Sequence, residues 1–403
     1  FILYQEQTMN TLNYAGFPID ECYGIIKAIA KKHPEKVRPL KTRFIEGFEK
    51  KIIEDDGVTE TEAKEMSEKV WQIISDSCGY GFNSAHAFCM ALDSLYNAYL
   101  KSHYPYEFYE VLMQTYSDKG KKDKVAILKQ EMEKAFNIQE GKYKFGADNR
   151  KFISDQKNKV IYPSLLSIKG LSQKCAEDLF ELSQKKSFDN FYNLWKQLNK
   201  IKSLNSAKID ILVKIGYFED FGTVGKIQRF IICLDDLYEK SQFNKDRIDE
   251  KYLSYIIKHT VETDKLYKSF DYDKELYEIW NDLDDKDISI SSKLQFELEC
   301  LGYVKTKIPK LSSDYAFVQG YECKFKNPKI ALYRLNSGEI ETVKVKRKQY
   351  DEAPINVGDI IKTIECTDDR IWINEGKDEN GKDIWRQDKE VTEIILKKWS
   401  FVR

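Results

Sequence analysis

The segment Trp71-Gln-Ile-Ile-Ser-Asp-Ser-Cys-Gly-Tyr-Gly-Phe-Asn-Ser-Ala-His86 predicts a tight corner between two helices. Before it, apolar residues in 60–77 recur at steps of three and four, as on one face of an amphipathic helix. Two glycines permit the turn, and Asn83 or Ser84 can cap the next helix. His86 then falls in that helix's first turn, where unpaired backbone N–H groups favour an anion. From the residues alone, a corner with a hydrogen-bonded histidine is the simpler interpretation.

Outward from this corner, the spacing of apolar residues remains helical as far as about residue 301. After that point the period changes to that of strands. Helices are expected over 84–101, 106–116, 124–136, 271–283 and 291–300, the last capped by Ser291-Ser292, with short extended pieces within 143–162. We expect four parts, with boundaries at 1–117, 118–225, 226–311 and 312–403.

The last of these parts carries a hairpin signal. Segments 329–335 and 340–346 flank Asn336-Ser337-Gly338-Glu339, and further strand-like runs cover 357–365, 370–373 and 391–402. Five or six short strands with glycine-containing turns predict a small barrel of the OB or SH3-like kind. The expected fold class is therefore mainly α with a small C-terminal β-barrel, an α+β multidomain chain.

Composition sets limits on the class of protein. The chain has 403 residues, with 65 Lys plus Arg against 66 Asp plus Glu, so net charge alone does not attach it to nucleic acid or lipid. Its 42% hydrophobic content excludes an intrinsically disordered chain, and no apolar run is long enough to span a membrane. Eight cysteines without a CxxC pair predict reduced thiols in a cytoplasmic protein. The opening Phe1-Ile-Leu-Tyr-Gln-Glu-Gln7, without Met or a signal segment, leads us to expect a fragment.

Five motifs carry a family resemblance. They are Leu3–Gln7, Tyr80–Ala87, Leu100–Pro105, Ser167–Ser172 and Glu297–Tyr303. In this order and at similar gaps, they resemble the bacterial family C replicative polymerases, the DNA polymerase III alpha subunits. The resemblance implies a fingers domain in the first part, a helix-hairpin-helix in the second, a helical linker in the third and an OB-like barrel in the last.

The resemblance also implies a contact with the triphosphate of an incoming nucleotide. Ile26 stands at a position where the family has arginine, and Ser84 where it has lysine. On physical grounds, lysines four residues apart share a helix face, and a solvated lysine face is the alternative interpretation. The implied phosphate-binding residues are Lys27, Lys31, Lys32 and His86, supported by the loop residues Tyr80, Gly81 and Asn83.

The hairpin implied by Ser167–Ser172 has its own physical logic. A glycine in a tight turn before a helix lets backbone N–H groups approach a DNA phosphate, and Lys169 adds charge. The implied DNA-binding residues here are Lys169, Gly170 and Ser172, with serine where the family pattern has glycine. A second unit is expected within 205–222, for which an ordinary helical hairpin is an equal alternative.

Cations in the strand zone form another expected DNA contact. Lys344, Lys346 and Arg347 lie near three possible stacking platforms, Tyr333, Tyr350 and Trp372. A basic groove with aromatic side chains is how OB folds hold single strands. Lysines that protect a solvated strand edge are an equal alternative.

No catalytic residue and no metal site is expected in this chain. Asp271-Tyr-Asp273 and the acidic pairs at 235–236, 284–285 and 368–369 fit helix starts and turns, where Asp is favoured. Cys89 is expected to be a core thiol rather than a zinc ligand. The resemblance implies that Mg²⁺ is held by palm aspartates upstream of Phe1.

The expected function is therefore that of a fragment of a DNA-directed DNA polymerase, which binds dNTP phosphates and primer-template DNA. Alone, it is predicted to be inactive. The implied partners are DNA, dNTP, a sliding clamp and other replisome subunits, and no membrane, although 226–281 holds no convincing clamp-binding peptide. The alternative is a non-catalytic DNA-binding or replisome-scaffold protein derived from such a polymerase.

Overall fold

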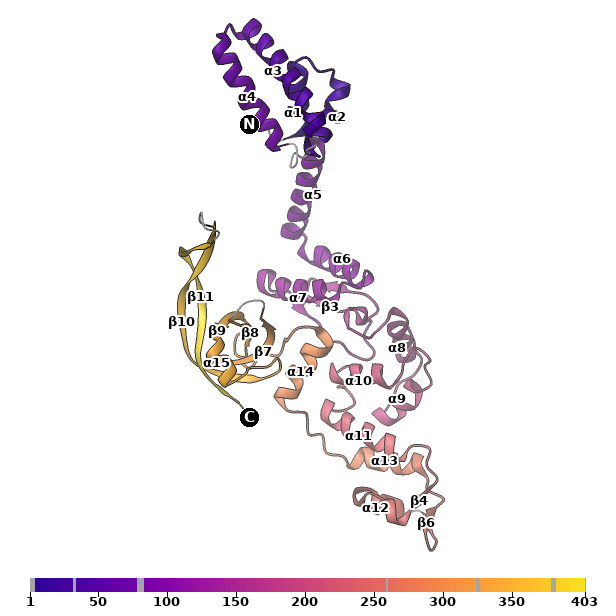
Figure 1. The fold of residues 1–403 in the computed structure, drawn as a ribbon. Coiled ribbons are helices and arrows are strands. Elements are labelled where there is room, and N and C mark those ends of the chain that lie inside the picture. Colours follow the sequence, from indigo (N-terminus) through magenta and orange to yellow (C-terminus); the bar gives the residue numbers. More distant parts are fainter. Residues whose placement is uncertain are drawn as a thin grey trace. The chain divides into compact units, whose positions relative to one another are not determined.

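The chain forms two compact units in the computed structural model, residues 1–104 and 105–403 (Figure 1). The helical and strand content agrees with the expected α+β multidomain class. The residues that the structure describes are 4–31, 34–77, 83–258, 260–323, 327–377 and 382–402.

The first unit is all helical. A buried aromatic pair, Phe44 and Trp71 with ring centroids 5.4 Å apart, joins its third and fourth helices, and Phe48 stacks on Phe44. Its helices are α1 Gln5–Tyr14, α2 Ile19–Ala30, α3 Pro34–Asp56, α4 Glu60–Ser77 and α5 Ser84–His103. The expected helix over 60–77 is therefore confirmed to the residue.

The helical part of the second unit begins at Pro105. Its helices are α6 Pro105–Asp118, α7 Lys122–Phe136, α8 Gln173–Lys185, α9 Phe191–Leu198, α10 Ser206–Lys214, α11 Val224–Leu237, α12 Glu250–Lys258, α13 Tyr272–Asp282 and α14 Ile290–Leu301, with 3₁₀ turns at Leu165–Ser167 and Lys245–Arg247. Small sheets are formed by β1 Gln139–Glu140, β3 Val160–Tyr162 and β2 Ile153–Asp155, and by β4 Gln242–Asn244, β6 Leu266–Lys268 and β5 Val261–Glu262.

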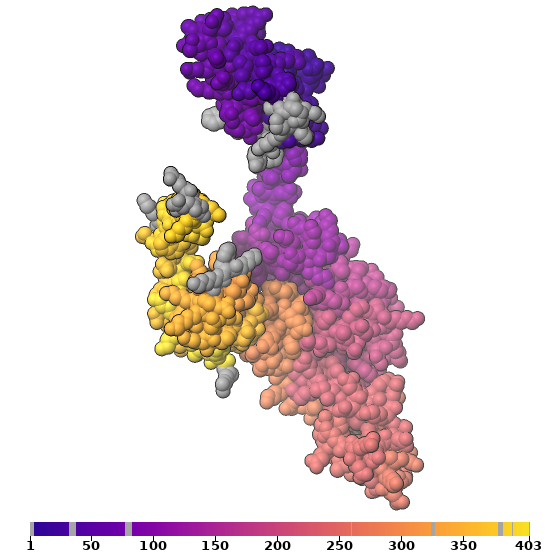
Figure 2. All heavy atoms as spheres, viewed as in Figure 1, coloured from indigo at the N-terminus to yellow at the C-terminus, as the bar shows by residue number. Residues whose placement is uncertain are grey.

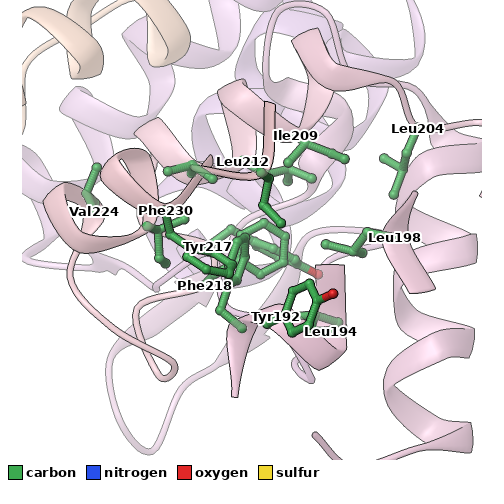
Figure 3. Packing of buried hydrophobic residues seen from close by; sticks show 14 of the residues in the cluster. Tyr192, Leu194, Leu198, Leu204, Ile209, Leu212, Tyr217, Phe218, Val224 and Phe230 are labelled. Carbon is green, nitrogen blue, oxygen red and sulfur yellow. The ribbon is translucent and has the colours of Figure 1, made fainter. Parts of the chain in front are cut away.

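Aromatic side chains fill the core between these helices. The ring centroids of Phe230 in α11 and Trp280 in α13 lie 5.1 Å apart. Those of Phe191 in α9 and Phe218 lie 5.5 Å apart. Figure 3 shows how Tyr192, Phe218 and Phe230 gather with aliphatic residues of α9 and α10. Edge-on aromatic contacts add to the area that these side chains bury, so this core fixes the angles between α9, α11 and α13.

The C-terminal strands pair in a closed order, β10-β11-β9-β8-β7 and back to β10. Neighbours are antiparallel except β9 and β11, which are parallel, and a short helix leads from β9 to β10. This Greek-key order of five strands confirms the expected small barrel and favours its OB-like form. The elements are β7 Tyr315–Glu322, β8 Lys329–Arg334, β9 Ile340–Val345, α15 Arg347–Glu352, β10 Ile360–Lys377 and β11 Asp383–Phe401.

The structure corrects several expected boundaries. Residues 360–365 and 370–373 belong to one continuous strand, β10, rather than to two, and 357–359 lie before it. Ser289, and not Ser291-Ser292, caps α14, because its side chain accepts the hydrogen bond from the Ser292 N–H. The expectation also missed β7, α15 and the sheet β4-β6-β5.

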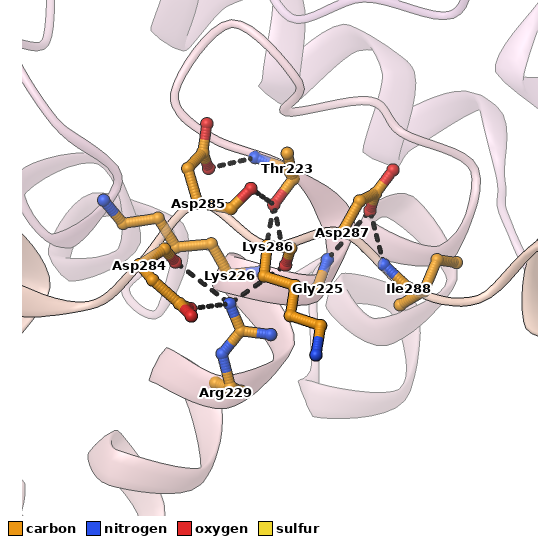
Figure 4. A network of polar contacts seen from close by, with 9 residues as sticks. All are labelled: Thr223, Gly225, Lys226, Arg229, Asp284, Asp285, Lys286, Asp287 and Ile288. Carbon is orange, nitrogen blue, oxygen red and sulfur yellow. Dashed lines mark hydrogen bonds and ion pairs between the residues drawn. The ribbon is translucent and has the colours of Figure 1, made fainter.

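Residues 284–288 run across the start of α11 and hold it by polar contacts (Figure 4). Arg229 donates to Asp284 at 2.6 Å, and the backbone N–H of Thr223 donates to Asp285 at 2.9 Å. The backbone N–H of Gly225 donates to Asp287 at 3.2 Å. The Asp284-Asp285 pair thus lies in a connecting segment that holds the start of α11, and not in a turn or at a helix start of its own.

Gly225 permits this crossing, because a Cβ there would lie 2.5 Å from the Lys286 carbonyl oxygen. We expect Gly225→Ala to lower the free energy of unfolding by about 1–3 kcal/mol, the usual cost of overpacking. Urea denaturation followed by circular dichroism measures this change. The control is Gly24→Ala within α2, where no atom lies within 4 Å and alanine favours the helix. Equal effects of the two substitutions would contradict the assignment.

Candidate nucleic-acid interface

The start of α5 already holds an anion supplied by the chain itself. The Glu6 carboxylate accepts the Ser84 N–H at 2.9 and 3.0 Å, and Asn83 accepts the His86 N–H at 2.9 Å. The Ser84 N–H holds the pKa of Glu6 below its ordinary value. Of the two caps that the sequence offered, Asn83 or Ser84, the structure has Asn83. The sequence missed Glu6, which lies 78 residues from its partner.

The helix α2 presents its expected cations to solvent. Lys27 is exposed, with its Nζ 4.4 Å from the centre of the Tyr23 ring, and Lys31 is exposed at the C-terminal cap. Ile26 is only 3% exposed and packs in the core of the first unit. The position at which the resemblance implies an arginine thus faces inward here and presents no charge.

The structure does not join all the expected phosphate-binding residues. His86 is exposed in the first turn of α5, and no hydrogen bond or ion pair links it to Lys27 or Lys31 in the part of the chain that is described. Lys32, Tyr80 and Gly81 lie outside the described residues.

The first hairpin presents a charged tip held by two apolar anchors. Ile168 and Leu171 are buried, whereas Lys169 and Gly170 between them are exposed. Gly170 has a φ of +91°, which favours glycine, and a Cβ there would lie 2.8 Å from Ile211. The alternation of buried and exposed residues turns Lys169 toward solvent just before α8 begins.

Two lysines fix the position of this tip from α7. Lys122 donates to the carbonyl of Ile168, and burial lowers the pKa of Lys122. The Ser172 side chain lies 3.2 Å from the Cys175 sulfur and does not cap α8. The sequence analysis did not single out Lys122, which is the first residue of α7.

The other lysine, Lys129, is the centre of a buried polar cluster directly behind the hairpin. Its Nζ lies 2.7 Å from Glu140 and donates to the Tyr143 hydroxyl at 2.7 Å. Tyr143 in turn lies 3.1 Å from the Ser167 hydroxyl, two residues before Lys169. Glu140 also accepts from the Tyr303 hydroxyl and pairs with Lys305 at 3.6 Å. We call these residues the Lys129 cluster: Lys129, Glu140, Tyr143, Ser167, Tyr303 and Lys305.

Charges within the Lys129 cluster set the state of its carboxylate. Burial alone would raise the pKa of Glu140, but Lys129, Lys305 and the Tyr303 hydroxyl outweigh it and lower that pKa to about 2. Glu140 is therefore ionised at neutral pH. The cluster links α7, the first hairpin and the segment that follows α14.

The second hairpin resembles the first in backbone but not in charge. Gly216 has a φ of +74° at the turn between α10 and α11. Lys214, two residues before it, is neutralised by Asp210 at 3.0 Å and Glu299 at 3.3 Å. Lys169, by contrast, makes no ion pair with any described residue. The first hairpin is thus the stronger candidate for binding a polyanion.

The cations of the barrel are less available than expected. Lys344 pairs with Glu393 at 2.7 Å, and Arg347 lies in α15 and pairs with Asp351 at 2.9 Å. Lys346 is exposed as the N-terminal cap of α15.

Of the three expected stacking platforms, only one stands open. Tyr333 is buried, so its expected role as a platform is wrong. Tyr350 stacks against Tyr321 with ring centroids 5.5 Å apart. Trp372 is 57% exposed.

Carboxylates and thiols among the described residues have structural surroundings. Asp271 caps α13, and Asp273 accepts hydrogen bonds from Tyr192 and Lys196. No three His, Cys, Asp or Glu side chains are grouped to hold a metal ion within the described ranges. Cys89 is exposed, so the expected core thiol is wrong, since α5 buries none of its residues. In the same ranges no helix is long and apolar enough to cross a membrane.

We expect Glu140→Gln to leave the Lys129 ammonium buried without its counter-charge. Breaking a buried pair costs about 3–5 kcal/mol of unfolding free energy. The folded pKa of Glu140 is depressed, so its contribution is full above about pH 4.5 and lost as the pH falls toward 2. Urea denaturation at several pH values measures the difference from the unmodified chain.

The control for this experiment is Glu133→Gln. Glu133 pairs with Lys307 at 2.6 Å, but both side chains are more than one-third exposed. An exposed pair contributes about 1 kcal/mol or less. A loss at Glu140 as small as that at Glu133, or one that does not shrink at low pH, would contradict the role of the cluster.

Comparison with known proteins agrees with this geometry. Residues 1–52 match the family model of the bacterial DNA polymerase III alpha subunit finger domain, and residues 134–226 match that of the helix-hairpin-helix motif. The second match contains both hairpins.

Similar proteins are DNA polymerase III alpha subunits. That of Campylobacter jejuni is 32% identical over 229 residues, 56% of this chain and 18% of the relative. That of Aquifex aeolicus is 28% identical over 54% of this chain and 18% of the relative, and that of Ureaplasma parvum 26% identical over 60% and 24%. The matched region thus spans about a fifth of the length of these relatives. These matches confirm the resemblance to bacterial DNA polymerase III alpha subunits over the matched residues.

Proposed function

We propose that this chain is the part of a replicative DNA-directed DNA polymerase that holds primer-template DNA through the first hairpin. The observation that carries the proposal is the exposed Lys169-Gly170 tip, fixed by Ile168, Leu171 and the Lys122 contact. Backbone N–H groups at the start of α8 and the Lys169 ammonium suit a DNA phosphate. Contacts of this kind are independent of base sequence, as copying any template requires.

The first unit is proposed to contact the incoming dNTP. Lys27 and Lys31 are exposed and four residues apart, so they can approach one polyphosphate together. His86 and Lys32 are proposed to assist, with Tyr80, Gly81 and Asn83 supporting the loop. Lysine neutralises charge without the two-pronged geometry of arginine, so this contact is electrostatic rather than directional.

Nucleotidyl transfer itself is assigned to residues outside this chain. The relatives are several times longer than the matched region, and polymerase chemistry needs carboxylates that hold two metal ions, here proposed to be Mg²⁺. A sliding clamp and other replisome subunits are proposed as partners of the whole protein. Lys346 and the paired cations Lys344 and Arg347 give the barrel a weaker claim to DNA.

We expect Lys169→Glu to weaken binding of duplex DNA whatever its sequence. Loss of one phosphate contact also lowers the slope of log affinity against log salt by about 1. Fluorescence anisotropy across a salt titration measures both values. The control is Lys265→Glu, the same charge change at an exposed turn beside β6. Equal weakening by both variants would show a general charge effect and remove the hairpin from the proposal.

We also expect the chain alone to bind a primer-template without extending it. A primer-extension assay with Mg²⁺ and all four dNTPs tests this directly. Its control is the same assay with an active polymerase added. Extension by the purified chain would contradict the assignment of catalysis to other residues.

A second candidate is a non-catalytic DNA-binding or replisome-scaffold protein derived from such a polymerase. It is favoured by Ile26, whose burial removes a charge where the family places arginine. Both candidates bind DNA, so the discriminating measurement is retention of labelled dATP by the complex of chain and DNA. Retention that depends on Lys27 supports the polymerase.

A further inference from the structure

Beyond the barrel, β10 and β11 continue as a long two-stranded ribbon. The strands pair from Cys366 and Leu396 outward to Lys377 and Asp383. β11 pairs with β9 only at Ile394–Leu396. Beyond those residues, toward Asp383, the described part of β11 pairs with β10 alone. Figure 1 shows the ribbon extending from the barrel, and Figure 2 shows its yellow atoms standing clear of the barrel body. The outer ribbon therefore pairs with no third strand among the described residues, and most of its described side chains are exposed.

One face of this ribbon carries two tryptophans. Trp372 lies opposite Gln387, and Asn374 lies opposite Trp385. Pairs two residues apart share a face, so the tryptophans are diagonal neighbours on it. They are 57% and 54% exposed. Two large side chains left in water on one small surface are typical of an interaction site.

The charge of the ribbon excludes nucleic acid as the favoured ligand of this face. Residues 364–394 contain ten Asp and Glu against five Lys and Arg, a net charge of −5 in a chain whose total is −1. One of the cations, Arg386, is paired with Glu375 on the ribbon itself. Phosphates would be repelled, whereas a cationic surface would be attracted. A second copy placed ribbon to ribbon would bring like charges together.

The edges of the ribbon are less suited to binding than its face. The register shifts between Arg370 and Trp372 and again between Asn374 and Gly376. Such bulges interrupt the row of backbone groups that an added strand would need. Recognition therefore has to use side chains, and the tryptophan face offers the largest ones.

We propose that the tryptophan face of the ribbon, Trp372 and Trp385 on a strand pair whose sequence has a net charge of −5, docks a basic segment of a partner protein. The two indoles are the anchors, and the acidic side chains attract and orient the positive segment. Cationic side chains over an indole face add a further attraction. This site is separate from the proposed DNA contact at Lys169.

The test compares three probes on the complete chain by fluorescence anisotropy. The probes are a labelled 20-residue peptide of repeated Lys-Leu-Lys-Ala, its Glu-Leu-Glu-Ala counterpart and a single strand of thirty thymidines. The Lys peptide binds, more weakly at high salt, and Trp372→Ala with Trp385→Ala lowers its affinity about tenfold or more. The Glu peptide does not bind. The thymidine strand binds the unmodified chain and the double tryptophan variant equally.

The matched control replaces two exposed aliphatic residues of the barrel, Ile340→Ala with Val357→Ala, which are 44% and 49% exposed. It leaves the Lys peptide bound, and circular dichroism shows both variants folded. The proposal is overturned if the Lys peptide fails to bind the unmodified chain, or if it binds the tryptophan variant as tightly as the unmodified chain. It is overturned as well if the Lys peptide binds the control variant as weakly as the tryptophan variant. It is also overturned if the tryptophan variant loses the thymidine strand, since the face would then bind nucleic acid. Duplex binding through Lys169 is measured independently of all these outcomes.

Discussion

A buried ammonium group has to be paired with a carboxylate or other acceptors. The second unit contains such a paired group, the ammonium of Lys129. Lys129 is 4% exposed and is met by the Glu140 carboxylate of β1, by the Tyr143 hydroxyl and by the Ser167 hydroxyl at the start of the first hairpin. Removing any of these partners would leave a charged or polar atom buried without a hydrogen-bond partner, which destabilises the folded state. The hairpin that presents Lys169 is therefore placed by electrostatics as well as by the apolar anchors Ile168 and Leu171.

The two hairpins show how similar backbones acquire different uses. Each has a glycine with a positive φ followed by a helix, and each has a lysine one or two residues before that glycine. Lys214 forms ion pairs with two carboxylates of the chain, whereas Lys169 is exposed to solvent. The backbone motif supplies a shape, and neighbouring charges decide whether that shape can receive a phosphate. This difference assigns the candidate DNA contact to the first hairpin.

Local patterns in the sequence predicted the elements that bury one face. The helix over 60–77 was found to the residue because Ala63, Trp71 and Ile74 all turn into the core. The outer part of β10 was divided in the prediction, since a ribbon open on both sides has no hydrophobic alternation to follow. Contacts across long separations, such as Glu6 with Ser84, have no local signature, so these parts of the candidate site needed the structure.

Glu6 at the start of α5 has a consequence for any anion that arrives there. Because it is tethered to the same unit, its local concentration is on the order of millimolar or more, and it acts as a permanent competitor. An incoming phosphate must outcompete this carboxylate or bind beside it. The start of α5 can therefore bind only an anion that makes enough additional contacts elsewhere to displace the Glu6 carboxylate.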